Sequence, residues 1–283
     1  MLIAAQIPAA ADAPVGIFDS GLGGLSVLRH VRVLLPLERL IYFADSAYAP
    51  YGDRTEAAVI ERTLAIAGFL VAQQCKALVL ACNTATAAAV SAVRERYPSL
   101  PVIGVEPGLK PATLCSASRV VGVLATGRTL ASARFQALEA RLAAATGVRF
   151  VSQACNGLAD QVEKGELHSP ATTALVRRYV EPLIRQGADT LVLGCTHYPF
   201  LLSLIEDCAR RTGGEHVKLI DTGAAVARQL KSVLTGRAIL CTADAVPYPV
   251  HGWTTGSASA LEAALMKLLM ISAPVSVLVE SRD

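Results

Sequence analysis

Short apolar runs alternate with longer amphipathic segments along almost the whole of this sequence. The apolar runs read as buried strands and occupy residues 15–19, 40–44, 77–81, 101–105, 120–125, 148–152, 190–194 and 216–220. Helix-like segments separate most of these runs, and parallel strands need crossovers of that kind. The alternation therefore predicts the α/β class, with parallel sheets covered by helices. Because such sheets bind ligands beyond the carboxyl ends of their strands, the polar residues after each run are candidate site residues.

An internal repeat indicates that the α/β unit occurs twice. The segment "ALVLACNTATA" (77–87) aligns with "TLVLGCTHYPF" (190–200). The segment "VGIFDSG" (15–21) aligns with "VGVLATG" (121–127) at nearly the same offset. Two such pairs are typical of a duplicated half. We therefore predict two pseudo-symmetric α/β domains with parallel sheets, and an active site in the cleft between them.

The chain length fits this two-domain interpretation, since 283 residues suffice for two domains of ordinary size. The predicted first domain comprises residues 13–106 plus 219–283, and the predicted second domain comprises residues 107–218. The first ten residues, "MLIAAQIPAA", are apolar but lack a basic start, so we interpret them as a short extension before the first strand. No apolar stretch approaches the roughly 18 residues that a membrane span requires.

Charge and cysteine usage narrow the class of partner and the compartment. The net charge is only +3, 17% of the residues are charged, and basic residues are scattered among acidic ones. This pattern predicts no nucleic-acid partner and favours a small polar ligand. The lack of a membrane-length apolar stretch predicts no membrane partner. The seven cysteines form no CxxC pair, and an odd number cannot all be paired. Free thiols indicate a reducing compartment, so we expect a cytoplasmic protein.

Two of the cysteines occupy equivalent positions of the repeat. Cys82 and Cys195 each end an apolar run, precede a helix-like segment and are followed by polar residues. A thiol near a helix N-terminus is expected to have a lowered pKa, because the backbone dipoles favour the thiolate. His197 lies two residues after Cys195, on the same side of an extended segment, and is a candidate proton partner. We interpret other cysteines as small buried hydrophobic residues: Cys75, Cys115, Cys208 and Cys241.

The first predicted strand ends in Asp19, which the glycine-rich segment "SGLGG" (20–24) follows. Asp19 could cap the next turn or contribute to a site at the strand end. The glycines allow close backbone approach and leave N–H groups exposed ahead of a helix, which suits a carboxylate or a phosphate. The segment matches neither the Walker pattern nor the dinucleotide-binding pattern.

Two thiols that face each other across a cleft suit inversion of a carbon that bears a hydrogen. One base removes the proton from one face while an acid delivers a proton to the other face, and a thiol can serve as either near neutral pH. Zinc could nominally use Asp19, Cys82, Cys195 and His197, but it would consume both thiols, so we expect no metal. Racemisation of this kind needs no cofactor.

Three other functions remain open at this point. A thiol hydrolase could use Cys82 or Cys195 with His197 and Asn83, but it leaves the second cysteine unexplained. A bilobed amino-acid binding protein would have no need of cysteines at both strand ends. A pyridoxal enzyme would need a lysine for its Schiff base, and none of the six lysines ends a strand within these motifs.

The sequence resembles the glutamate racemases, a family of cofactor-independent amino-acid racemases, from about Val15 to "WTTG" (253–256). The segments that carry the resemblance are "GIFDSGLGGLSV" (16–27), "DSAYAPYG" (45–52), "ACNTATA" (81–87), "VIGVEPG" (102–108), "GVLAT" (122–126), "LVLGCTHYPFL" (191–201) and "IDTG" (220–223). The aspartate-racemase branch typically lacks the "DSGxGG" and "PYG" elements. The resemblance therefore implies interconversion of L- and D-glutamate, with D-glutamate used for bacterial peptidoglycan.

The resemblance also implies roles for individual residues. Cys82 would act on the D-enantiomer with support from Asp19, and Cys195 on the L-enantiomer with support from His197. Glu163, in "QVEKGE", would be a further carboxylate near the second cysteine. The implied substrate contacts are Asp19, Ser20, Tyr51, Gly52, Asn83, Thr84, Thr196 and His197. The expected partner is the small-molecule substrate glutamate, and no metal or cofactor is expected. The sequence does not decide whether the protein forms a homodimer.

Two segments depart from the family pattern. The family usually reads A-T-x-G-T after the fifth strand, whereas this chain reads "ATGRT" (125–129), with Arg128 where a glycine is expected. The segment "ACN" (154–156) replaces Ala-Cys-Pro. Because of the first departure, Thr126 and Thr129 are not carried over as substrate contacts. The second departure changes the sequence of the loop that leads to Glu163.

Overall fold

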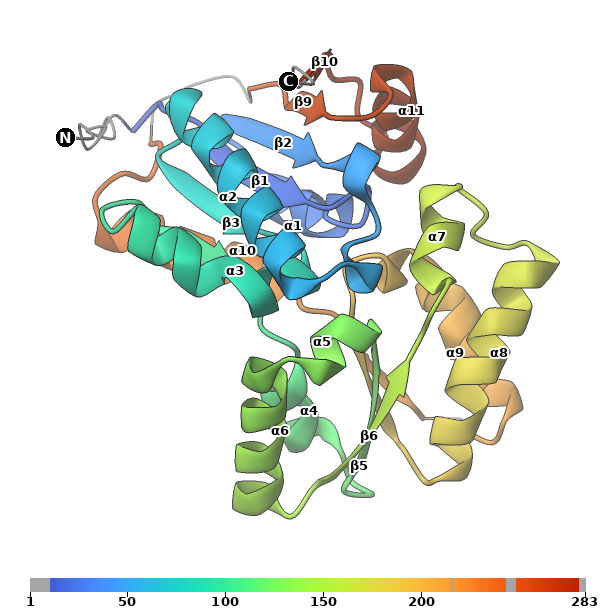
Figure 1. Cartoon of the computed structure of the whole chain (residues 1–283). Helices are drawn as coiled ribbons and strands as arrows, with labels where there is room; N and C mark the ends of the chain where they lie inside the picture. Colours follow the sequence, from blue (N-terminus) through green and yellow to red (C-terminus); the bar gives the residue numbers. More distant parts are fainter. Residues whose placement is uncertain (1–10, 215, 243–247, 280–283) are drawn as a thin grey trace.

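The protein contains two parallel β-sheets, seen in the upper and lower halves of Figure 1. The computed structural model describes residues 11–214, 216–242 and 248–279, so the predicted extension at 1–10 lies outside the described residues. The first sheet has the strand order β10-β9-β2-β1-β3-β4. Its strands are β1 (Val15–Asp19), β2 (Leu40–Ala44), β3 (Ala77–Leu80), β4 (Val102–Gly104), β9 (His251–Thr254) and β10 (Val275–Val277).

The second sheet repeats the order of the first four strands. Its order is β6-β5-β7-β8, which corresponds to β2-β1-β3-β4 of the first sheet. Its strands are β5 (Val120–Ala125), β6 (Arg149–Ala154), β7 (Thr190–Gly194) and β8 (Lys218–Ile220). In each sheet the chain first adds a strand on one side and then crosses to the other, so the topological switch point lies between β1 and β3, and between β5 and β7. Ligands of open α/β sheets bind at such points.

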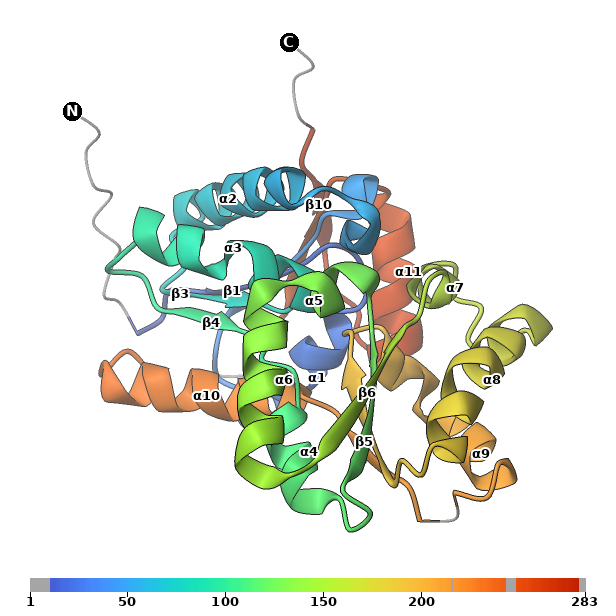
Figure 2. The same ribbon diagram turned by 60° about the horizontal axis from the view of Figure 1, so that its bottom comes forward.

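Helices cover both faces of the first sheet. Successive strand residues point to opposite faces, so Ile17 and Tyr42 face one hydrophobic core while Phe18 and Phe43 face another. The first core is closed by α1 (Leu25–Leu34), α10 (Gly223–Gly236) and α11 (Ala258–Leu269), and the second by α2 (Glu56–Ala72) and α3 (Asn83–Arg96). Figure 2 shows α2 and α3 above this sheet, with α10 and α1 below it.

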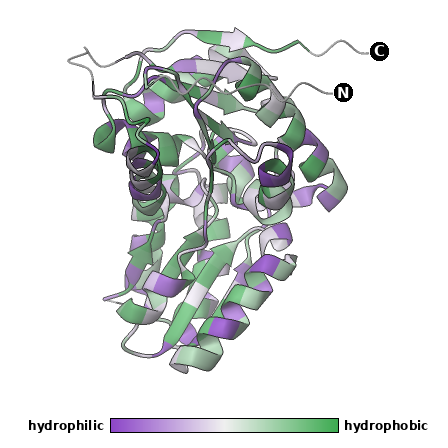
Figure 3. Ribbon diagram, turned by 90° about the vertical axis from the view of Figure 1, so that its left-hand side faces the viewer, coloured by the Kyte–Doolittle hydropathy of each residue, from purple (hydrophilic) through white to green (hydrophobic). Residues whose placement is uncertain are grey.

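The second sheet is layered in the same way. Its two cores are closed by α4 (Leu109–Cys115) and α6 (Ala133–Thr146) on one face and by α7 (Leu158–Glu163), α8 (Pro170–Arg185) and α9 (Leu202–Arg211) on the other. The short helix α5 (Gly127–Ala131) follows β5 directly. Short 3₁₀ helices occupy Ser46–Tyr48, Tyr51–Asp53 and Tyr198–Leu201. In Figure 3 the helices carry hydrophobic and hydrophilic colours together, as amphipathic helices do.

The chain crosses between the two sheets twice. It leaves the first sheet after β4 and returns to it after β8, since α4 packs in a core of the second sheet and α10 in a core of the first. The predicted boundary at residue 219 falls within β8, which pairs with β7 in the second sheet. The division of the chain into domains stays a prediction. None of the described helices combines the length and the apolar character needed to cross a membrane.

The predicted α/β class and the eight predicted strands are confirmed, with strand ends that differ by up to two residues. Strands β9 and β10 were absent from the prediction. The segment "HGWT" of β9 is no apolar run, and β10 has only three residues at the edge of its sheet. Both strands extend the first sheet beyond β2, on the side away from the switch point.

Candidate active site

Three of the predicted site residues lie at the carboxyl ends of β1, β3 and β7. Asp19 is the last residue of β1, Cys82 follows β3 by two residues, and Cys195 follows β7 directly. These strands flank the switch points of the two sheets. A hydrogen bond joins the two sets of strand ends, because the Thr196 hydroxyl donates to Asp19 Oδ2 at 2.9 Å. The predicted residues from both sheets therefore meet at one place.

Cys82 is a buried thiol at the start of α3. As the N-cap residue, its sulfur accepts a hydrogen bond from the Ala85 N–H at 3.4 Å, and it lies 3.7 Å from the Ser20 hydroxyl. Burial raises the pKa of Cys82 to about 12, and the negative charge of Asp19 acts in the same direction. The prediction of a lowered pKa is therefore wrong for Cys82. Burial raises the pKa of Cys82 by more than the helix N-terminus lowers it. The thiol is therefore protonated at neutral pH.

Cys195 lies beside a protonated histidine. His197 Nδ1 is 3.5 Å from the Cys195 sulfur, and its Nε2 is 2.6 Å from Glu163 Oε1. Burial lowers the pKa of His197, but the negative charges and hydrogen bonds of Cys195 and Glu163 outweigh burial and raise it well above the ordinary value. With both ring nitrogens protonated, the imidazolium can donate to the sulfur and to the carboxylate at once. The Cys195 sulfur and the Glu163 carboxylate therefore lie on the two nitrogen atoms of one imidazolium ring.

Glu163, the last residue of α7, belongs to this group through contacts with both sheets. Burial raises its pKa, but the hydrogen bond and charge of His197 outweigh burial, and the net result is a lowered pKa. Its Oε1 also accepts the backbone N–H of Leu22 from the first sheet's loop at 2.7 Å. The carboxylate is therefore ionised and holds the imidazolium from the side opposite Cys195.

Asp19 is completely buried and accepts hydrogen bonds with both oxygens. Its Oδ1 receives the Ser20 hydroxyl at 3.1 Å and the Gly21 N–H at 3.0 Å, while Oδ2 receives the Thr196 hydroxyl. Burial raises the pKa of Asp19, and the His197 charge and the hydrogen bonds offset only part of that effect. A carboxyl group with a raised pKa beside Cys82 can take part in proton transfer.

The glycines of "SGLGG" allow the first sheet's loop to pack against the second sheet's residues. A Cβ on Gly21 would lie 2.1 Å from Glu163 Oε1, and a Cβ on Gly23 would lie 2.5 Å from His197 Nδ1. The exposed N–H that the glycine pattern suggested is that of Leu22, and the carboxylate that it binds is Glu163. At this position the loop therefore binds the Glu163 side chain and not a ligand.

Hydroxyl and amide groups gather next to Cys82. Thr84 Oγ1 lies 3.1 Å from Thr126 Oγ1 and 3.4 Å from Thr129 Oγ1, so the two residues of the "ATGRT" segment stay close to a predicted substrate contact. Asn83 is buried, and neither of its side-chain amide atoms has a hydrogen-bond partner among the described residues. An unpartnered buried amide is costly, so this group is well suited to bind a polar ligand.

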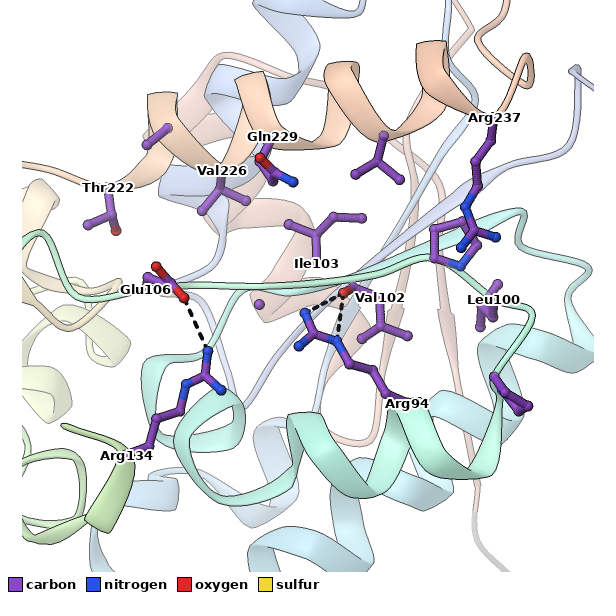
Figure 4. A pocket seen from close by; sticks show the side chains of 15 residues that line it. Arg94, Leu100, Val102, Ile103, Glu106, Arg134, Thr222, Val226, Gln229 and Arg237 are labelled. Carbon is purple, nitrogen blue, oxygen red and sulfur yellow. Dashed lines mark hydrogen bonds and ion pairs between the residues drawn. The ribbon is translucent and has the colours of Figure 1, made fainter. Parts of the chain in front are cut away.

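Two of the cavities differ in their position relative to this site. A hollow of about 20 Å³ is lined by Gly52, Thr126, Cys155 and Asn156 among other residues, from loops of both sheets. A cavity of about 640 Å³ lies between α10, β4 and the end of α3, where Arg94, Arg134 and Arg237 line it (Figure 4). Neither cysteine lines the larger cavity. Within the described ranges, no three His, Cys, Asp or Glu side chains are grouped as a metal would require.

The comparisons with known proteins agree with this geometry. The sequence model of the family described as Asp/Glu/hydantoin racemase matches residues 26–230. The chain belongs to the Asp/Glu/hydantoin racemase family. It is 52% identical to a glutamate racemase of Ectopseudomonas mendocina over 268 residues, which cover 94% of this chain and 98% of that relative.

Solved structures of this racemase family share the fold. Glutamate racemase isoform RacE1 from Bacillus anthracis superposes with a TM-score of 0.84 at 34% identity, covering 94% of this chain and 97% of that chain. Escherichia coli glutamate racemase, solved with L-glutamate and the activator UDP-MurNAc-ala, gives a TM-score of 0.80 at 30% identity and covers 94% and 98% of the two chains.

The structure of this family member adds contacts that the sequence does not show. Thr126 aligns with Ser20 in the repeat, a signal that could have indicated its place at the site. The substrate contact of Tyr51 stays a prediction, and the structure shows that its side chain is buried and that its hydroxyl donates to Asp45 Oδ2 at 2.6 Å. Gly52 lies against Thr126, since a Cβ on Gly52 would be 3.1 Å from Thr126 Cβ. A ligand contact of Tyr51 or Gly52 is therefore expected from the backbone of these two residues.

Substitution of Gly23 by alanine should disrupt the racemase site without requiring a change of fold. The new Cβ would lie 2.5 Å from His197 Nδ1 and 2.6 Å from Thr196 Oγ1, so the imidazole or the loop must move. Displacements of about 1 Å can reduce rates by about 10²-fold, and we expect a loss in kcat of at least that size. The matched control is Gly236→Ala, where an added Cβ meets no atom within 4 Å. Equal kcat in the two variants would contradict this role of the loop.

Proposed function

We propose that this protein is a glutamate racemase, an isomerase that interconverts L- and D-glutamate without a cofactor. The observation that carries the proposal is the pair of cysteines at equivalent strand ends of two sheets with the same strand order. Their surroundings differ: Cys82 is a thiol with a raised pKa, while Cys195 is in contact with an imidazolium. One acid and one base are what a proton transfer across an sp³ carbon requires.

In the proposed L-to-D direction, the Cys195 thiolate removes the Cα proton of L-glutamate. The electron pair of the broken C–H bond stays on the substrate, delocalised into its carboxylate. The Cys82 thiol then donates its proton to the opposite face of Cα, which gives D-glutamate, a thiol at Cys195 and a thiolate at Cys82. His197, held by Glu163, stabilises the thiolate at Cys195 before the transfer.

In the D-to-L direction the two thiols exchange roles. The Cys82 thiolate removes the proton and the Cys195 thiol donates one. Asp19 is the proposed partner of Cys82, because its charge is among the groups that raise the pKa of this thiol and its hydroxyl partner Ser20 lies beside the sulfur. A carboxyl group with a raised pKa can accept the proton that Cys82 must lose before it acts as a base.

The proposed substrate contacts are the polar groups that surround the two thiols. The unpartnered Asn83 amide can bind a carboxylate or an ammonium group, and the Thr84 hydroxyl lies beside it in the chain. Hydroxyls and backbone N–H groups suit the two carboxylates of glutamate, while Asp19 can attract its ammonium group. The remaining proposed contacts are Ser20, Thr196, His197 and the backbone of Tyr51 and Gly52.

A thiol hydrolase is less well supported. It would use Asn83 to orient His197, but the described partners of the His197 ring are Cys195 and Glu163. The Asn83 amide has no partner among the described residues. Structural relatives include a glutamate racemase solved with L-glutamate, and we extend that substrate to this chain as part of the proposal.

The cellular part of the proposal follows from the activity. D-glutamate made by this enzyme would supply peptidoglycan synthesis and thereby cell-wall biogenesis and cell shape. We propose the cytoplasm as its location, because all seven cysteines are free, as expected in a reducing compartment. We also propose a homodimer, which light scattering of the purified protein tests.

Circular dichroism of the amino acid tests the function directly. The purified protein is incubated with L-glutamate, without added pyridoxal phosphate or metal, and the signal is followed with time. Decay to zero, also when the reaction starts from D-glutamate, is the expected result. A constant signal despite saturable binding of glutamate would support a binding protein and overturn the proposal. The absence of pyridoxal-type absorbance in the active enzyme is expected as well.

A further inference from the structure

A buried carboxylate outside the proposed catalytic group organises the loop that follows β2. Asp45 has no exposed surface, and three side chains donate hydrogen bonds to its two oxygens. Oδ2 receives the Tyr51 hydroxyl at 2.6 Å and Arg62 Nε at 3.0 Å. Oδ1 receives Arg62 Nη2 at 2.9 Å and the Thr255 hydroxyl at 2.8 Å. The donors come from three separate segments of the chain, so this one side chain ties them together.

Arg62 makes a bidentate contact with the Asp45 carboxylate. Bidentate arginine–carboxylate pairs are among the stronger and more directional interactions in proteins, and this pair is largely buried. The Arg62 guanidinium also lies 3.7 Å from the centre of the Tyr48 ring. Arg62 of α2 therefore holds the 3₁₀ turn at residues 46–48 in place. On the other side, the Ala47 N–H donates to the hydroxyl of Thr255, which follows β9, at 3.1 Å.

The segment held in this way faces the proposed substrate site. Gly52 directly follows the anchored Tyr51 and lies against Thr126, whose hydroxyl is 3.1 Å from that of Thr84. The backbone of Asp45 is also connected to the site, because its N–H donates to the carbonyl oxygen of Asp19 at 3.0 Å. A displacement of the Tyr51 ring would move Gly52 directly, whereas neither cysteine contacts Asp45 in the hydrogen bonds described.

We propose that Asp45 is a positioning residue, which holds Tyr51 and Gly52 in place through the Tyr51 hydroxyl and thereby sets the affinity for glutamate. The inference rests on the proposed function for the identity of the ligand. Without the anchor, binding must order the segment first, and that cost weakens the affinity for both enantiomers alike. A residue that assists binding of both ground states and transition states changes KM and leaves kcat nearly constant.

The test uses Asp45→Asn, which keeps the shape but removes the charge, and Tyr51→Phe, which removes only the hydroxyl. A hydrogen bond to a charged group corresponds to at least about tenfold in affinity, so each variant should raise KM for L- and D-glutamate about tenfold. We expect kcat to change less than about threefold. Because Asp45 acts through the Tyr51 hydroxyl, the double variant should raise KM no further than the more affected single variant.

A matched control separates positioning from general stability. Thr63→Val, on α2 next to Arg62, removes a buried hydroxyl that donates to the Val59 carbonyl within the helix and has no hydrogen bond to the loop among the described residues. It should lower the thermal midpoint and leave KM unchanged. If Asp45→Asn and Tyr51→Phe lower the midpoint but leave KM unchanged, or lower kcat alone, the positioning role is wrong. Tyr51→Phe decides the question by itself if Asp45→Asn does not fold.

Calorimetric titration keeps this test separate from that of the proposed function. The Kd of the parent protein for D-glutamate is compared with that of Tyr51→Phe, which needs no turnover. A parent that binds glutamate without racemising it would overturn the proposed activity, while a tenfold weaker Kd in Tyr51→Phe would still support the positioning role. Equal Kd values in an active parent and in the variant would overturn the positioning role alone. A parent that neither binds nor converts glutamate overturns both.

Discussion

Replacement of either cysteine by alanine should abolish racemisation and retain proton removal from one enantiomer only. Racemisation needs a group on each face of Cα, and loss of one should reduce the rate by about 10⁴-fold, the upper end of a typical acid–base contribution. Elimination from a glutamate analogue with a leaving group on its nitrogen or β-carbon needs only the first proton removal. Cys195→Ala should therefore eliminate from the D-analogue through Cys82, and Cys82→Ala from the L-analogue through Cys195.

The physical reason is the placement of one thiol at each sheet. Cys82 follows β3 of the first sheet and Cys195 follows β7 of the second, so a substrate between them turns its Cα hydrogen toward one thiol or the other. Elimination is measured by the release of the keto acid from each enantiomer. A variant that eliminated both enantiomers equally, or that racemised glutamate near the parent rate, would contradict the assignment of one base to each face.

The second large effect concerns the partners of the two thiols. His197→Asn removes the imidazolium that lies 3.5 Å from the Cys195 sulfur, so kcat from L-glutamate should fall by about 10² to 10⁴. Asp19→Asn should reduce kcat from D-glutamate by a similar factor, because Asp19 is near Cys82. The equilibrium constant still fixes the ratio of the two kcat/KM values, so the asymmetry must appear in the individual kcat values.

Full progress curves from each enantiomer give these values. Asn fits the space of either side chain but cannot carry their charges, so folding of each variant is checked by its thermal midpoint. Losses below about threefold in both directions would show that Asp19 and His197 have structural roles only. Glu163→Gln offers a graded comparison: it keeps a hydrogen-bond acceptor for His197 Nε2 without the negative charge that raises the pKa of His197.

Several of the candidate site residues could be predicted because a local pattern in the sequence distinguishes them. Cys82, Cys195 and Asp19 could be predicted because each ends an apolar run, and the repeat related two of them. His197 followed from its spacing to Cys195. The strand ends converge because parallel strands present their carboxyl ends at one edge of the sheet, which is a property of the fold class.

Other features depend on contacts between distant segments, which no local pattern encodes. Glu163 comes from α7 and meets Leu22 and His197 only in the folded chain, so its role was available through the family resemblance alone. The raised pKa of Cys82 reflects the depth of its burial, which outweighs the helix N-terminus. The anchoring of Tyr51 by Asp45 was missed because the sequence does not show where a hydroxyl points.

Isotope incorporation tests the two-base account most directly. L-glutamate is converted in D₂O, and deuterium at Cα is measured by mass spectrometry in the recovered L-glutamate and in the D-glutamate at early times. The account predicts deuterium almost only in the D-product, because Cys195 removes the substrate proton while Cys82 delivers one that has exchanged with solvent. The reverse reaction should label the L-product. Equal early labelling of the recovered substrate and the product would indicate a single base and contradict the account.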